Sequence, residues 1–110
     1  MENRTVTRSL LFDFYGELLT DKQREYFDLH WNEDYSLAEI AELGGLSRQG
    51  VWDILRRAEG LLQQYEEKTG LVQRHLDRVA EIRAIRERLQ SLLPENEETR
   101  AILARLDGLS

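Results

Sequence analysis

One stretch, SLAEIAELGGLSRQGVWDILRR at residues 36–57, constrains the fold more than any other part of the chain. Ser36 and Glu39 have the spacing of a capping box, in which each side chain bonds to the other residue's backbone amide at a helix start. Gly44 and Gly45 supply a turn, because a positive φ costs glycine least. The stretch therefore predicts two short helices joined by a tight turn.

The apolar residues of this stretch predict that the two helices cross closely. Ser47 is an N-cap for the second helix. Small Ala41 in the first helix can admit branched Val51 and Ile54 from the second. This combination is typical of a helix-turn-helix. The alternative, an ordinary αα-hairpin, does not explain why the small residue, the glycine turn and the branched residues occur together.

The rest of the chain predicts an all-α protein with about six helices. It has one proline, and its seven glycines lie mostly near expected helix ends. We expect a single domain over residues 1–110, in which residues 70–110 are a C-terminal helical extension to the N-terminal helices and helix-turn-helix of residues 1–69. Outside the motif's first helix, helices are predicted over residues 4–19, 20–31, 47–68, 71–93 and 97–106. Thr20 and Gln23 have the spacing of a second capping box, and Gly70 is the expected stop of the helix over residues 47–68.

Each of these helices has an expected apolar face. In the first helix it consists of Leu10, Leu11, Phe14, Tyr15 and Leu18. In the fifth it is a near-heptad seam of Val72, His75, Val79, Ile82, Ile85 or Arg86, Leu89 and Leu93. In the last helix Ile102, Leu103 and Leu106 are expected to dock on the bundle. The helix over residues 47–68 has a similar long stripe, which includes Val51, Ile54, Leu55, Ala58, Leu61, Leu62 and Tyr65. The long stripes of this helix and of the fifth helix indicate self-association as a homodimer through these segments, with the C-terminal extension as the expected interface.

The sequence lacks the residues that several kinds of functional site require, and it lacks the segments that a membrane or secreted protein requires. The chain has no cysteine, which excludes disulfides and thiolate metal sites. His30 has no second ligand at a metal-binding spacing, so we expect it to pack beside Trp31. No nucleophile elbow or P-loop is present, and we expect no enzyme activity, metal or cofactor. No apolar run approaches the ~20 residues of a membrane span and no signal-peptide cleavage pattern is seen, so we expect a cytoplasmic protein with no membrane contact.

The second helix of the motif has a candidate binding face opposite its buried stripe. In a helix-turn-helix this face enters the major groove. Gln49 is suited to adenine, and Arg48 or Arg56 to guanine or a phosphate. An exposed Trp52 would favour contact with a base, a partner or a second subunit, whereas an ordinary solvated helix face is the alternative reading. The predicted nucleic-acid-binding residues are Ser47, Arg48, Gln49, Trp52, Asp53 and Arg56, with backbone contacts from Arg57, Arg74 and Arg78.

The charge distribution is evidence against the hypothesis that the chain is a simple DNA-binding protein. Residues 20–46 contain two basic and seven acidic residues, residues 47–69 contain four of each, and residues 70–94 contain five arginines and three acidic residues. A duplex-binding domain usually has a basic surface, and Asp53 in the binding face would repel phosphate unless it accepts a hydrogen bond from cytosine. The fifth helix suits a phosphate backbone or, alternatively, forms salt bridges with its own glutamates.

These residues resemble two known groups. The helix-turn-helix resembles region 4 of sigma-70 factors, in Glu39-Ile40-Ala41, the serine-initiated second helix and the pair Arg57-Ala58. More closely, most of the chain resembles the YlxM family of small bacterial helix-turn-helix proteins. The residues that carry this are Asp34-Tyr35-Ser36-Leu37, Glu39-Ile40-Ala41-Glu42, Ser47-Arg48-Gln49, Val51, Asp53 and Tyr65-Glu66-Glu67-Lys68. That family usually has Tyr at the position of Trp52 and often Ala at that of Gly50.

The resemblance implies an all-α, dimeric protein from a Gram-positive-type bacterium. Genes of the family typically lie beside those of the signal recognition particle GTPase and its receptor, which implies a part in the protein-targeting pathway. Three functions remain open. The first is a dimeric DNA-binding regulator with recognition helices about 34 Å apart. The second is an adaptor that binds the targeting GTPase or its small RNA, through acidic residues 21–42 or the arginines of the fifth helix. The third is a structural dimerisation module.

Overall fold

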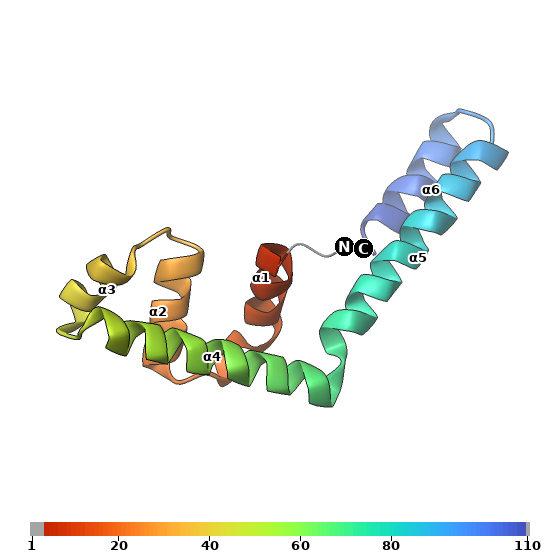
Figure 1. Ribbon diagram of the computed structural model, residues 1–110. Coiled ribbons are helices and arrows are strands. Elements are labelled where there is room, and N and C mark those ends of the chain that lie inside the picture. Colours follow the sequence, from red (N-terminus) through yellow and green to blue (C-terminus); the bar gives the residue numbers. More distant parts are fainter. Residues whose placement is uncertain (1–3, 110) are drawn as a thin grey trace. The chain divides into compact units, whose positions relative to one another are not determined.

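The fold is all-helical. A computed structural model describes the backbone of residues 4–109, and side chains from Thr7 onward. Within residues 4–109 it contains six α-helices, one short 3-10 helix and no strand, which confirms the predicted fold class (Figure 1). The elements are α1 (Arg4–Tyr15), η1 (Gly16–Leu18), α2 (Asp21–Trp31), α3 (Leu37–Gly44), α4 (Arg48–Thr69), α5 (Leu71–Leu92) and α6 (Glu97–Asp107).

The chain divides into two compact units at the junction of α4 and α5. The first unit ends at Gly70 and the second begins at Leu71. Gly70 has a φ of 65°, and its backbone N–H donates to the carbonyl of Glu66. A left-handed residue of this kind ends a helix at low cost only when it is glycine. The predicted helix stop at Gly70 is therefore confirmed.

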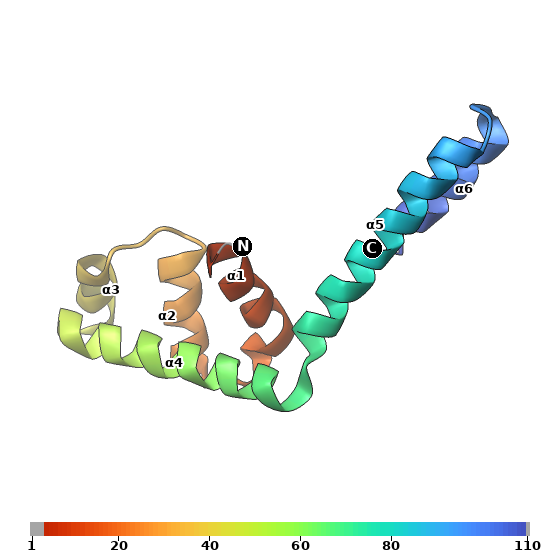
Figure 2. The same ribbon diagram turned by 45° about the vertical axis from the view of Figure 1, so that its right-hand side comes forward.

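The first unit is organised along α4. Helices α1, α2 and α3 all pack against this long helix, as Figures 1 and 2 show. The predicted stripe of α4 is turned toward the other three helices and is buried inside the unit, so it is not available for the self-association that we expected of it. The fully buried side chains of the unit are Leu11, Phe27, Ile40, Val51, Leu55, Ala58 and Leu62.

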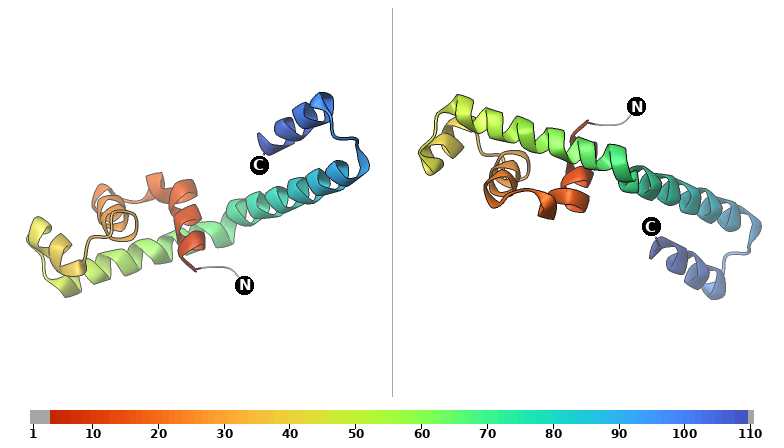
Figure 3. Two further views of the ribbon diagram at one scale, coloured as in Figure 1. Left: turned by 90° about the horizontal axis from the view of Figure 1, so that it is seen from above. Right: turned by 90° about the horizontal axis from the view of Figure 1, so that it is seen from below.

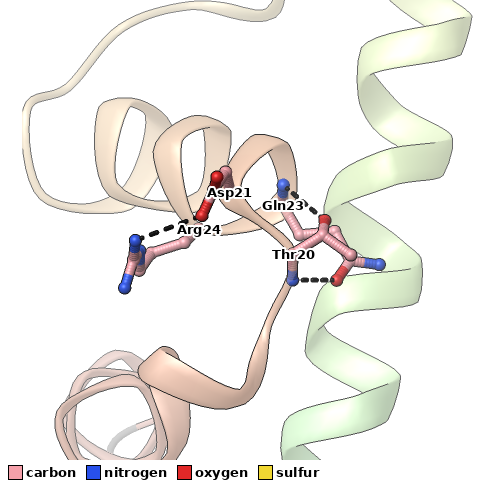
Figure 4. A network of polar contacts seen from close by, with 4 residues as sticks. All are labelled: Thr20, Asp21, Gln23 and Arg24. Carbon is pink, nitrogen blue, oxygen red and sulfur yellow. Dashed lines mark hydrogen bonds and ion pairs between the residues drawn. The ribbon is translucent and has the colours of Figure 1, made fainter.

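Capping boxes start two of the helices that surround α4. Thr20 Oγ1 accepts from the backbone N–H of Gln23, and Gln23 Oε1 accepts from the N–H of Thr20 (Figure 4). Ser36 and Glu39 make the same reciprocal pair at the start of α3, with both distances 3.0 Å. Both boxes satisfy backbone donors that a helix start leaves unpaired, and both predictions are confirmed.

The end of the first helix differs from the prediction. The α-helix stops at Tyr15, and the chain tightens into η1 before α2. This change of pitch turns Leu18 outward, where it is 62% exposed, and turns Leu19 into the core. Phe14 is exposed as well, so the predicted apolar face is wrong at these two positions. Phe12 instead stacks on the ring of Phe27, with centroids 5.0 Å apart.

Polar side chains fasten α1 to its neighbours. Nε of Arg8 lies 2.6 Å from Oε1 of Glu59, and its guanidinium carbon lies 3.7 Å from the ring centroid of Trp31. The hydroxyl of Tyr15 donates to Oε1 of Glu66 at 2.6 Å. The Arg8 side chain is 13% exposed and that of Glu59 37%, so the two contacts are partly shielded from water and fix the position of α1 against α2 and α4.

The second unit is a helical hairpin, in which α6 folds back along α5 (Figure 3). Leu103 and Thr99 are buried in α6, and the middle of the predicted α5 seam is half-buried. Ile102 does not dock, because it is 42% exposed. The sequence left open whether Ile85 or Arg86 belongs to the α5 seam. In the structure Arg86 faces α6, with its Nε 2.6 Å from Oδ1 of Asp107, whereas Ile85 is exposed.

Within residues 4–109, no helix combines the length and the apolar character needed to cross a lipid bilayer.

Candidate nucleic-acid interface

The helix-turn-helix is formed by α3, a three-residue turn and α4. Gly45 ends α3 with a φ of 66°. The N–H of Leu46 then donates to the carbonyl of Ala41 at 2.9 Å, which closes the turn. The hydroxyl oxygen of Ser47 accepts from the N–H of Gly50 at 3.0 Å and caps α4. The start of the second helix is therefore held by local hydrogen bonds, as the spacing predicts.

The outer row of α4 lies opposite its buried stripe. We use this name for Gln49, Trp52, Asp53 and Arg56, which follow one another at helical spacing on the side away from the core. Arg48 and Arg57 flank the row and are exposed. The structure therefore brings all the predicted residues of the motif together along about three turns of one helix.

Trp52 borders a shallow hollow at the start of this row. The indole is 41% exposed, and the hollow is also lined by Leu37, Arg48 and Gln49. Leu37 belongs to α3, so the hollow spans both helices of the motif. An exposed indole beside an arginine and a primary amide supplies an apolar surface together with hydrogen-bond donors. Such a surface can contact the methyl group and the edge of a base.

Asp53 is paired with its neighbours in the row. Its Oδ1 accepts from Nε2 of Gln49 at 3.1 Å, and Nη2 of Arg56 lies 3.9 Å from the same oxygen. The carboxylate is therefore balanced in part by a cation one turn away. From the sequence we expected Asp53 to repel phosphate or to accept from cytosine, but not to bond to Gln49, although their spacing of four residues suits a hydrogen bond along a helix.

The remaining predicted contacts lie elsewhere. Arg74 and Arg78 are on α5, in the second unit, and both side chains are exposed. The described part of the structure gives neither arginine an ion pair with Glu81 or Glu87, the alternative that the sequence leaves open. Both cations are therefore available to an external anion.

Acidic side chains are concentrated on the first helix of the motif and in the segment that precedes it. The seven carboxylates of residues 20–46 lie on α2, on α3 and in the connection between these helices, and six are exposed while Asp28 is half-buried. Hydrogen bonds from the backbone N–H and the hydroxyl of Ser36 lower the pKa of Glu39, because they favour its charged form. The segment of residues 20–46, which we call the acidic front, thus carries a net negative charge at neutral pH.

The sequence missed one residue that supports this site. Arg8 ties α1 to both Trp31 and Glu59, and Glu59 lies one turn beyond Arg56 of the outer row. An isolated arginine next to the apolar run Leu10–Leu11 is the only signal available, since a long side chain can extend its charge away from an apolar face. Its partners are about 23 and 51 residues away in the chain, so no local pattern identifies them.

Comparison with known proteins agrees with this architecture. A family model described as "Putative helix-turn-helix protein, YlxM / p13 like" matches residues 2–102. The chain is 53% identical over 87 residues to a UPF0122 protein of Caldanaerobacter subterraneus subsp. tengcongensis, covering 79% of this chain and 74% of the relative. It is 53% identical over 95 residues to a UPF0122 protein of Thermoanaerobacter sp. strain X514, covering 80% and 81%.

A third relative extends the match across nearly the whole chain. The chain is 41% identical over 109 residues to a UPF0122 protein of Geobacillus kaustophilus, covering 99% of each sequence. The YlxM resemblance drawn from the motifs is therefore confirmed.

Proposed function

This chain belongs to the YlxM/p13-like helix-turn-helix family, and from that premise we propose that it is a regulatory protein that binds duplex DNA through the outer row of α4. One observation carries the proposal. Polar and aromatic side chains are exposed along the first turns of the second helix, while the opposite stripe is buried against α1, α2 and α3. This is how a helix-turn-helix presents its recognition helix to the major groove.

Each residue has a distinct part in this proposal. Gln49 and Arg48, in the first turn of α4, contact base edges. The Ser47 hydroxyl donates its hydrogen to a phosphate, since its oxygen already accepts from Gly50. Arg57, beside the row, binds a phosphate, while Arg74 and Arg78 on α5 are separate candidates for contacts with a nucleic-acid backbone. These are binding functions, and the proposal involves neither catalysis nor a cofactor.

The test combines selection from a random duplex library with a double substitution. We expect Arg48→Ala together with Gln49→Ala to weaken binding to the selected site at least tenfold, because it removes two base contacts. The melting temperature should change little, since both side chains are exposed. Fluorescence anisotropy at several salt concentrations measures the affinity.

Gln64→Ala is the matched control. It repeats the glutamine half of the change on the same helix at an exposed position, about 22 Å further along. Binding should be retained. Full binding by the double variant would show that another surface reads the DNA.

We also propose that the hairpin of α5 and α6 pairs with a second copy of itself. The hairpin leaves Ile85, Leu92, Ile102 and Leu109 exposed. Residues 70–94 have more arginines than acidic residues, whereas residues 95–110 have four acidic residues and two arginines. Two copies related by a two-fold axis can therefore place the basic helix of one against the acidic helix of the other while they cover this apolar surface.

The acidic front supports a second candidate function. The exposed carboxylates of α2 and α3 suit a basic protein or the basic part of a ribonucleoprotein better than a phosphate backbone. In this candidate function the chain is an adaptor of the protein-targeting pathway, which binds the signal recognition particle GTPase through its acidic residues or the small RNA of the particle through the arginines of α5.

A pull-down with tagged protein distinguishes the candidates, with the lysate divided into nuclease-treated and untreated halves. Recovery of the GTPase from both halves supports the adaptor and a protein contact. Recovery only without nuclease supports a contact through RNA. Enrichment of one chromosomal sequence from the untreated half supports the DNA-binding regulator.

A further inference from the structure

Asp53 lies in the middle of the outer row and contacts a residue on each side. Gln49, one turn earlier, donates to its Oδ1, and Arg56, one turn later, places Nη2 3.9 Å from that oxygen. The side chain of Asp53 is 45% exposed, so the contact lies on the surface that a bound duplex would cover. An acidic residue in a DNA-reading row weakens phosphate binding, which makes its position there informative.

We propose that Asp53 is a positioning residue that holds the amide of Gln49 in the orientation that reads adenine. This inference rests on the DNA-binding function proposed above, and deepens it by assigning an A·T base pair to the first turns of α4. The assignment follows from which hydrogen-bonding groups of Gln49 remain available.

The hydrogen-bonding groups of Gln49 and adenine match once Asp53 has taken its share. A glutamine side chain has two N–H donors and one carbonyl acceptor. Gln49 gives one N–H to Asp53. One N–H and the carbonyl oxygen remain, and these are the groups that bond to N7 and to the N6 amino group of adenine. The pairing is complete, with no group of the amide left unsatisfied.

The carboxylate also removes an ambiguity. The last torsion of glutamine is broad and roughly two-fold, so a free amide can turn either its oxygen or its nitrogen toward the groove. A carboxylate only accepts hydrogen bonds, and therefore fixes the nitrogen of Gln49 on its own side. The remaining orientation presents the carbonyl oxygen to a base that donates, which favours adenine over guanine, whose O6 only accepts.

The negative charge has a separate effect on unrelated DNA. Binding to unrelated sequences depends almost entirely on phosphate contacts. Asp53 offsets part of the charge of Arg56 and repels the backbone, so it lowers this background. Positioning of the Gln49 amide raises the affinity for a site with A·T at the position that it reads. The negative charge of Asp53 lowers the affinity for all other sites.

The test uses the full chain and the site selected by the wild type. Affinity is measured for that site, for its three base substitutions at the position read by Gln49, and for an unrelated duplex. We expect Asp53→Ala to reduce discrimination at that position about tenfold and to raise affinity for the unrelated duplex. Asp53→Asn removes the charge and offers Gln49 both an acceptor oxygen and a donor nitrogen, so it should raise background binding and lose part of the discrimination, because the amide of Gln49 is no longer fixed in one orientation.

Two further variants separate positioning from charge. Gln49→Ala should abolish discrimination at the same base pair, and addition of Asp53→Ala to it should change discrimination no further. Asp77→Ala is the matched control, because Asp77 accepts from Nε2 of Gln73 at 2.9 Å in the same four-residue arrangement on α5. It removes one negative charge and one such bond outside the outer row, and should leave discrimination intact.

The outcomes are distinguishable. If Asp53→Ala discriminates as well as the wild type at that position, or if the selected position is not A·T, the positioning inference is wrong while DNA binding stands. If the wild type selects no duplex sequence at all, the proposed function itself fails.

Discussion

Two adjacent glycines at the end of α3 are required for different reasons. Gly45 has a φ of 66°, and a Cβ added there would meet nothing within 4 Å. Gly44 is helical, but its added Cβ would lie 2.1 Å from Oη of Tyr26. Gly45 therefore supplies a backbone conformation, whereas Gly44 supplies space for the buried ring of Tyr26 on α2. The sequence assigns both glycines to the turn and cannot separate these roles.

We expect Gly44→Ala to destabilise the protein by about 1–3 kcal/mol, the usual cost of overpacking. Alanine ordinarily favours a helix over glycine, so the sign of the effect is informative. Tyr26→Phe removes Oη but leaves Cζ 3.1 Å from the added Cβ, so Gly44→Ala should cost less in the Tyr26→Phe background than in the wild type. Chemical denaturation followed by circular dichroism measures these free energies of unfolding.

Gly45→Ala gives the comparison within the same turn. It should cost about 1–2 kcal/mol, because an L-residue is strained in the left-handed region. Tyr26→Phe should not rescue it, since no side chain lies near the added methyl group. Equal rescue at both positions would contradict the two roles.

At the scale of a helix, the start of α3 depends on the charge of Glu39. Hydrogen bonds from Ser36 lower the pKa of this carboxyl in the folded state. A lowered folded pKa adds stability above the unfolded value of about 4.3, and that stability is lost as the pH falls through the folded pKa. Helix α3 should therefore weaken in acid through this capping box.

Glu39→Gln tests this dependence. Glutamine keeps the capping-box geometry but does not titrate. The melting temperature of the wild type should exceed that of the variant at pH 7, and the difference should shrink as the pH falls below about 4.3. Glu42→Gln, on the same helix but outside the box, is the control. A difference that does not change with pH would contradict the assignment.

For the whole molecule, the proposed dimer predicts a change of mass on substitution. Ile102→Glu places a charge in the exposed apolar surface of α6 and should convert a dimer into a monomer, because burial of an unpaired charge is unfavourable. Sedimentation equilibrium measures the mass, and circular dichroism checks that the helical content of the wild type, and with it the hairpin, is retained.

Ala104→Glu is the control for this prediction. Ala104 is exposed on the same helix, about 160° around it from Ile102. This variant should remain dimeric. A wild type that is monomeric at all concentrations, or an Ile102→Glu variant that stays dimeric, would refute pairing through this surface. Leu62 is unsuited to such a test, because it is fully buried in the first unit.

Local signals in the sequence predicted the helix starts and stops. The capping residues Thr20, Ser36 and Ser47 and the terminators Gly45 and Gly70 all act as expected. Each acts through hydrogen bonds to residues within a few positions along the chain, so spacing alone identifies them. The helix-turn-helix and its outer row follow from the same signals and from the 3.6-residue period.

Contacts between distant residues were decided only by the tertiary structure. The inward turn of Leu19 in place of Leu18, the choice of Arg86 over Ile85 in the α5 seam, and the partners of Arg8 all depend on where another helix lies. Periodicity defines a face of a helix to within about one residue, but side-chain packing selects among neighbours on that face. That selection requires the positions of residues far apart in the chain, which a local pattern does not contain.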